Sequence, residues 1–160
     1  MQQERNQLKL YQRTLPSLDL KRRQLTVELA KARRELQTIQ EAVESLEAHI
    51  GEQLPMLANT DIEVSDLVKM TDFELEQENV VGVRLPRLKR IHCSVADYSL
   101  LAKPAWVDIL VARLKDAAEQ RTLVLVSTER VRILEIQEKR VTQRVNLFEK
   151  ILIPTARRNI

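Results

Sequence analysis

The residues of this chain that could do chemistry are few and scattered. The two histidines are His49 and His92, and the single cysteine, Cys93, directly follows the second. A structural metal site needs about four ligands, and no Cys or carboxylate stands at metal-ligand spacing around both histidines. The chain has only two glycines, and Gly82 to Pro86 is a turn signal rather than a phosphate loop. We therefore predict no catalytic site, no cofactor and no metal.

Two short basic clusters, Lys21-Arg22-Arg23 and Arg33-Arg34, could contact nucleic acid phosphates. Aromatic side chains that would stack on bases are missing nearby. The acidic stretch that follows would repel a phosphate backbone. We expect no nucleic-acid binding.

The composition favours long helices. Aromatic residues make up 3% of the 160 residues, charged residues 31%, and there are 5 prolines. Ala, Leu, Glu, Lys, Arg and Gln dominate, as in coiled coils. No apolar run reaches the roughly 20 residues that span a bilayer, and the first residues lack the apolar core of a signal peptide.

A coiled-coil seam runs through the first part of the chain, taken as residues 1–58. Positions alternately three and four apart are apolar at eleven of thirteen places. They are Leu15, Leu18, Arg22, Leu25, Leu29, Ala32, Leu36, Ile39, Val43, Leu46, Ile50, Gln53 and Leu57. Pro16 fits a first helical turn, so Thr14 or Ser17 is a candidate N-cap and residues 4–13 a separate or bent extension. Arg22 either reaches out to solvent or pairs across with Glu138 or Glu149. Gly51 and Pro55 predict a bend or stop.

Residues 59–103 break this pattern. Residues 60–70 are expected to hold a short helix, and residues 72–95 to form a small β-hairpin because apolar residues there alternate and are β-branched. A lone hairpin is marginal in water, so it should lean on the helices or on a partner.

A second, less regular seam occupies residues 104–160, beginning near Pro104. Nine of its thirteen positions are apolar. They are Leu110, Arg113, Ala117, Gln120, Val124, Ser127, Val131, Leu134, Glu138, Val141, Val145, Phe148 and Leu152. A second apolar stripe runs beside it, and Pro154 should end or kink the helix. The two matched helices predict an all-α dominated fold, a long antiparallel two-helix coiled coil; the seams alone leave intermolecular pairing open.

Charge is distributed unevenly along the chain. Residues 1–34 carry 9 Lys or Arg and 3 Asp or Glu, whereas residues 35–78 carry 1 and 12. Residues 130–160 carry 8 and 3. An antiparallel hairpin brings both basic stretches to one end, which could orient the rod between partners of opposite charge. The competing interpretation is a solvated surface that maintains solubility.

Three motifs, in order along the chain, resemble one family. Leu20-Lys21-Arg22-Arg23-Gln24-Leu25 is loosely similar to a basic region near the family's N-terminus. Asn79 to Pro86 (NVVGVRLP) resembles its Asn-x-x-Gly-Val-x-x-Pro segment. Thr142 to Pro154 (TQRVNLFEKILIP) is similar to its closing signature, with Phe148 as an extra residue. The family is that of the D subunits of V/A-type rotary ATPases. The resemblance singles out as structural motif residues Gly82, Pro86, Val145, Asn146, Leu147 and Pro154.

The resemblance implies a long left-handed antiparallel coiled coil. It also implies that this coiled coil is a central rotor shaft, which transmits torque between a hexameric A–B catalytic head and an ion-translocating membrane ring. It implies binding to the F subunit of the central stalk and to a funnel-shaped subunit that caps the ring. The protein would lie on the cytoplasmic side, peripheral to the membrane through the complex and not inserted in it. We expect the basic end to contact the head by long-range electrostatics, through Lys21, Arg22, Arg23, Arg140, Arg144, Arg157 and Arg158.

Two other classes of function stay open at this point. A generic coiled-coil scaffold or adaptor would dimerise and ignore both the F subunit and the head. A small all-α enzyme would build a pocket by dimerising, and only the polar seam positions Arg113, Gln120 and Ser127 favour it.

Overall fold

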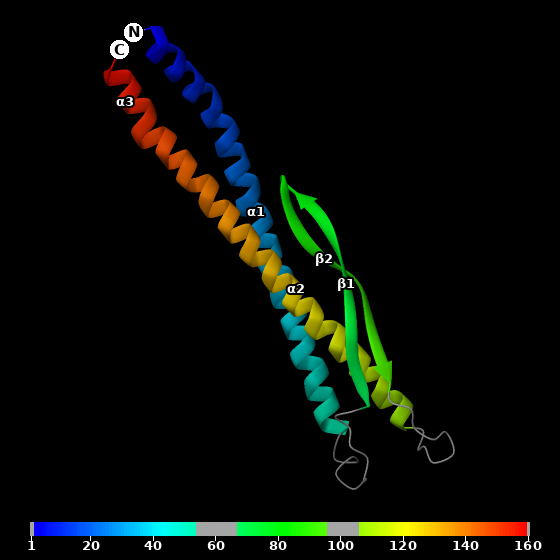
Figure 1. Cartoon of the computed structure of the whole chain (residues 1–160). Helices are drawn as coiled ribbons and strands as arrows, with labels where there is room; N and C mark the ends of the chain where they lie inside the picture. The colour runs from blue at the N-terminus through cyan, green and yellow to red at the C-terminus, as the bar shows by residue number, and fades with distance from the viewer. Residues whose placement is uncertain (1, 54–66, 96–105, 160) are drawn as a thin grey trace. The chain divides into compact units, whose positions relative to one another are not determined.

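The structure, a computed structural model, describes residues 2–53, 67–95 and 106–159. Its elements follow the order α1 (Gln2–Gln53), β1 (Val68–Val80), β2 (Val83–Val95) and α2 (Trp106–Leu147). A π-helical turn η4 (Phe148–Leu152) and a short helix α3 (Ile153–Arg158) complete the chain (Figure 1). The strands β1 and β2 form a two-stranded sheet. The predicted fold class, two long helices with a small hairpin between them, is confirmed.

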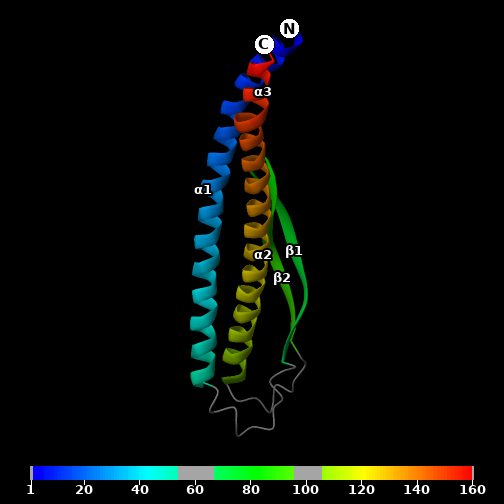
Figure 2. The same cartoon turned by 90° about the vertical axis from the view of Figure 1, so that its left-hand side faces the viewer.

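The chain folds as two compact units. The terminal unit comprises Met1–Arg33, Asn79–Leu85 and Arg130–Ile160, and the connecting unit comprises Arg34–Glu78 and Pro86–Glu129. Both chain ends therefore belong to the same unit (Figures 1 and 2). Each unit holds a part of α1, a part of α2 and a part of the hairpin.

The helical segments of the terminal unit run antiparallel. The rings of Tyr11 and Phe148 meet edge to face, with centroids 5.3 Å apart. Further along α1, Arg33 donates a hydrogen bond of 2.6 Å to Glu135. Residue numbers thus rise along α1 as they fall along α2. In the connecting unit, the Arg121 guanidinium contacts the Glu47 carboxylate at 2.5 Å, which joins the same two helices.

The predicted seams describe the buried faces of both helices. Every predicted position from Leu15 to Ile50 on α1, and from Leu110 to Leu152 on the second segment, is buried or half-buried. Leu25 and Leu134 are 0% and 1% exposed. Their removal from water, at about 25 cal/mol per Å² of apolar area, stabilises the pairing, whereas the exposed ion pairs contribute about 0–1 kcal/mol each.

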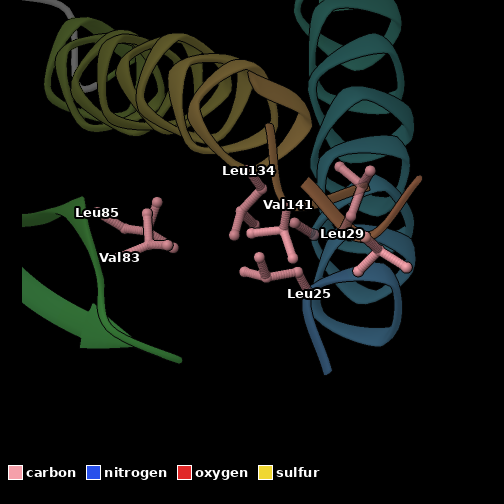
Figure 3. Packing of buried hydrophobic residues seen from close by; sticks show 8 residues of the cluster. Leu25, Leu29, Val83, Leu85, Leu134 and Val141 are labelled. Atoms are coloured by element: carbon pink, nitrogen blue, oxygen red, sulfur yellow. The ribbon is translucent and has the colours of Figure 1, made fainter. Parts of the chain in front are cut away.

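The core of the terminal unit also includes the tip of the hairpin. Val83 and Leu85 belong to one buried cluster with Leu25, Leu29, Ala32, Leu134, Val141 and Val145. Figure 3 shows side chains from α1, α2 and the hairpin in this cluster. This shared cluster confirms the prediction that the hairpin packs against the helices. A two-stranded sheet needs such a contact because it cannot enclose a core of its own.

Helix α1 runs unbroken through Pro16, so the predicted separate extension before it is wrong. Pro16 and Gln12 are exposed, and the carbonyl of Gln12 that loses its partner can bind water there. Thr14 Oγ1 donates to the Leu10 carbonyl at 2.8 Å, four residues back within the helix, so Thr14 is not an N-cap. The seam instead continues through half-buried Leu8 and Tyr11, and their burial offsets the cost of the proline.

The hairpin is longer than predicted. Val68–Met70, expected at the end of a short helix, are the first residues of β1, and the rest of that range lies outside the described residues. Thr71 Oγ1 donates to the His92 carbonyl at 3.0 Å, and Ser94 Oγ to that of Lys69 at 3.3 Å. These cross-strand bonds favour the extended conformation over a helix.

Several boundary predictions cannot be followed in the structure. Helix α1 continues through Gly51 to Gln53, and the predicted stop at Pro55 lies outside the described residues. The same holds for the boundaries at residues 58 and 104 and for Pro104.

Helix α2 has a further buried face that the seam did not predict. Val107, Val111, Thr122 and Val126 are each at most 8% exposed. In the connecting unit, Thr122 Oγ1 donates to the Ala118 carbonyl at 2.8 Å and lies 3.3 Å from Met70 Sδ on β1. Their intervals of four, eleven and four residues, which are close to whole numbers of helical turns, place these positions on one helical stripe.

The hairpin turn needs residues in the left-handed region. Val81 and Gly82 have φ values of 52° and 75°, as in the tight turns that join two strands. A β-branched residue is strained at positive φ. Val81 packs against the buried cluster, which offsets this cost.

Substituting Gly82→Ala should lower the free energy of unfolding by about 1–2 kcal/mol, because alanine disfavours positive φ. A Cβ there would meet only Lys21 Nζ, at 3.7 Å, so the loss reflects the backbone alone. Urea unfolding followed by circular dichroism measures it. The matched control is Gly51→Ala, which meets nothing within 4 Å in helix α1 and should gain up to about 1 kcal/mol. Equal effects of the two substitutions would contradict this account.

Candidate functional site

His92 and Cys93 lie on β2 beside an open hollow of about 380 Å³, lined also by Ile91, Lys115 and Glu119. The ring of His92 is bound to a neighbouring strand, with Nε2 3.0 Å from Glu74 Oε1. This hydrogen bond, ahead of the nearby positive charges, lowers the pKa of the Glu74 carboxyl. Within the described ranges no three His, Cys, Asp or Glu residues gather as metal ligands.

All seven basic residues predicted to contact a partner belong to the terminal unit. Arg22 and Arg23 both bind Asp19, at 2.6 and 2.9 Å. The ion pair with Asp19 replaces the alternative in which Arg22 pairs across with Glu138 or Glu149, and the Arg22 side chain remains 35% exposed. Glu138, the expected partner, instead accepts hydrogen bonds from Thr142 at 3.0 Å and Thr26 at 3.5 Å.

The remaining basic residues of this set are exposed. Lys21 extends over the hairpin turn, where its Nζ lies 3.7 Å from the place a Cβ on Gly82 would occupy. Arg140, Arg144, Arg157 and Arg158 have exposed side chains. In the described part of the chain these four arginines make no ion pair, so their charge faces solvent.

The two units of the fold carry opposite net charges. The terminal unit contains 17 Lys or Arg and 6 Asp or Glu, for a net +11. The connecting unit contains 9 Lys or Arg and 17 Asp or Glu, for a net −8. The basic terminal unit attracts acidic partners over a range of about one Debye length, roughly 8–10 Å at physiological salt.

The residues that the family resemblance singled out lie in the hairpin and in the C-terminal helical segment. Gly82 forms the turn, and Val145 is 2% exposed in the core. Pro86 is half-buried in β2, and Asn146 is half-buried beside Leu147, which is 42% exposed. Pro154 stands in the first turn of α3 without ending the helix. The sequence predicted an end or kink at Pro154, and the structure has a π-helical turn immediately before it.

The contact between Tyr11 and Phe148 was not predicted. Phe148 was recognised as a seam position, but Tyr11 was assigned to a separate or bent helical extension. The signal was present in the sequence, since Leu8 and Tyr11 continue the three-and-four spacing N-terminal to Leu15. Such aromatic pairs add about 0.5–1.5 kcal/mol beyond the area they bury.

These features define a coiled-coil protein with a β-hairpin between its two helices and a charged surface as its candidate site. No described helix combines the length and apolarity needed to cross a bilayer.

The chain belongs to the family of ATP synthase D subunits, whose profile matches residues 1–160. It is 36% identical to the V-type ATP synthase D subunit of Chlamydia muridarum, over 98% of this chain and 78% of that protein. The protein of the same name from Chlamydia abortus is 39% identical, over 91% of this chain and 71% of its own length. The V-type ATP synthase D subunit of Borreliella burgdorferi is 31% identical, over 100% of this chain and 79% of that protein.

The hydrogen bond between Glu74 and His92 should make the free energy of unfolding depend on pH in the acidic range. Because the folded-state pKa of Glu74 is lowered, its contribution is present above the unfolded pKa and is lost as pH falls through the folded value. The parent should therefore be more stable than Glu74→Gln at pH 5–6, and the difference should shrink progressively as pH falls below about 4.3, the ordinary pKa of glutamate. Glu76→Gln, on the same exposed strand, is the control. Urea unfolding across pH measures both, and parallel pH profiles for the two variants would contradict the prediction.

Proposed function

We propose that this chain is the central rotor shaft, the D subunit, of a V/A-type rotary ATPase or ATP synthase. It transmits torque between the A–B head, where ATP is hydrolysed or made, and the ion-translocating membrane ring. Its partners are the F subunit, the A–B head and the funnel-shaped subunit that caps the ring. The chain contributes no catalytic group and lies peripheral to the membrane, on its cytoplasmic side.

The antiparallel seam of the terminal unit is the observation that carries this proposal, together with membership of the family. Transmission of torque requires that two helices resist sliding and unwinding together. In the terminal unit the seam buries leucine and valine from both helices and is joined by the hairpin tip. Single, well-packed cores deform little because their packing density is close to that of organic crystals.

The surface charge supports a defined orientation. The terminal unit, at net +11, holds both chain ends. We propose that this unit enters the head and that the exposed arginines Arg140, Arg144, Arg157 and Arg158 guide it there. Lys21 contributes beside the hairpin turn, whereas Arg22 and Arg23 are partly neutralised by Asp19. Electrostatic guidance of this kind raises association rates more than it raises affinity.

A binding experiment tests the proposal directly. The tagged chain is mixed with the F subunit and with the A–B head of the same organism, and complexes are sized by light scattering. We expect a one-to-one complex with the F subunit, and this complex should dock once per head. A stable homodimer that binds neither partner would contradict the rotor assignment and favour a scaffold.

Charge reversal tests the orientation. Replacing Arg140→Glu and Arg144→Glu should slow association with the head about tenfold at low salt, because both side chains are exposed on the basic unit. The effect should shrink at about 1 M salt, where the Debye length is about 3 Å. Arg87→Glu with Lys89→Glu, an equal charge change on exposed residues of the connecting unit, is the control. Stopped-flow association rates measure both, and equal slowing by the two double variants would rule out the proposed orientation.

A further inference from the structure

The helical segment after α2 contains a local change of hydrogen bonding. Over Phe148–Leu152 the chain forms a π-helical turn, and the Ile153 N–H donates to the Phe148 carbonyl, five residues back. An α-helix would bond residues four apart. A π-helical turn accommodates one more residue than an α-helical turn over the same rise, and such turns occur mostly as single bulges inside α-helices.

The burial pattern changes at the same place. Val141, Val145 and Phe148 follow the seam's alternation of four and three, which would continue at Leu152, Thr155 and Asn159. Thr155 and Asn159 are exposed instead. Ile153 and Ala156 are each 8% exposed. Leu152, four residues after Phe148, is still half-buried. The next buried position is Ile153, five residues after Phe148, the same as the hydrogen-bond interval.

We propose that this π-helical turn is a one-residue insertion that resets the coiled-coil register. It places Ile153 and Ala156, rather than Thr155 and Asn159, on the face that packs inside the terminal unit. Without it, two polar residues would enter the seam and an isoleucine would face solvent. The contact of Phe148 with Tyr11 holds the start of the turn against α1.

Pro154 contributes to the turn but does not explain its register. Proline has no N–H, and its ring clashes with the carbonyl four residues back in an α-helix. The clash alone would kink the helix without deciding which residues are buried. The seam decides this, because burying Ile153 removes far more apolar area from water than burying Thr155 would.

The register also determines what the C-terminal end presents. With Ile153 and Ala156 buried, Arg157 and Arg158 are exposed. These arginines belong to the surface proposed to meet the catalytic head, and this consequence rests on the proposed function. The turn is thus a positioning element for the basic end rather than a contact itself.

Two single-residue deletions test the proposal in the full chain. Lys150 lies in the turn and Lys139 in regular α2, and both are exposed lysines. Deleting Lys150 should convert the turn to α-helix and keep the seam, leaving Tm within about 3 °C of the parent. Deleting Lys139 should displace Val141 and Val145 from the seam and lower Tm by about 10 °C or more. Equal losses in the two deletions would overturn the proposal.

A third variant separates the seam from the proline. In Pro154→Ala the π-helical turn should persist, with Ile153 still buried, as read from backbone chemical shifts or a crystal structure. A regular α-helix with Thr155 buried would show that the proline sets the register and would overturn the proposal. Head binding adds a functional readout: the Lys150 deletion should bind within about threefold of the parent, under 1 kcal/mol. A parent chain that fails to bind the head would refute the proposed function and leave the Tm test intact.

Discussion

Burial of an apolar seam between antiparallel helical segments is the interaction on which the rest of this structure depends. The chain has few aromatic residues, and the buried cluster of the terminal unit consists of aliphatic side chains from the helices and the hairpin tip. In the terminal unit, Leu25, Leu134 and Val145 are almost fully removed from water. Their burial must offset the conformational entropy of two long helices, which costs about 1–2 kcal/mol per residue for the backbone alone. Exposed ion pairs between the helices contribute little, so the seam provides most of the stability.

Other features are adjustments that keep the seam continuous. Helix α1 accepts Pro16 on its exposed side so that Leu8 and Tyr11 can extend the seam. The hairpin turn accepts a valine at positive φ, while Val83 and Leu85 enter the core. The π-helical turn before Pro154 restores burial at Ile153 and Ala156. In each case a local conformational cost of a few kcal/mol or less is outweighed by apolar burial.

Charge distinguishes the two units, whereas the apolar seam provides most of the stability of the helix pairing. The exposed faces of the helices vary freely in sign because the seam excludes most charges, and the two units differ by opposite net charges of +11 and −8. For a proposed rotor, a charged and sparsely aromatic surface allows guidance by a partner without a single deep binding minimum. Hot-spot residues of tight interfaces are typically Trp, Tyr and Arg in buried pockets. Of these, the basic end offers exposed arginine.

The amino-acid sequence by itself determined the two helices, the seam face of each and the family motifs. The seams follow from side-chain spacing, because a 3.5-residue apolar period is typical of paired helices and each position reports its own polarity. The second buried face of α2 and the pairing of the helices within one chain came from the structure. Only the tertiary structure decided the continuity of α1 through Pro16, the partner of Arg22, the length of the hairpin and the register after Phe148. Each of these depends on a comparison between a local cost and the burial or hydrogen bonding of residues distant in the chain. The charge distribution needed both sources of information. The basic and acidic stretches are visible in the sequence. Only the structure shows that the hairpin tip belongs to the basic unit and the rest of the hairpin to the acidic unit.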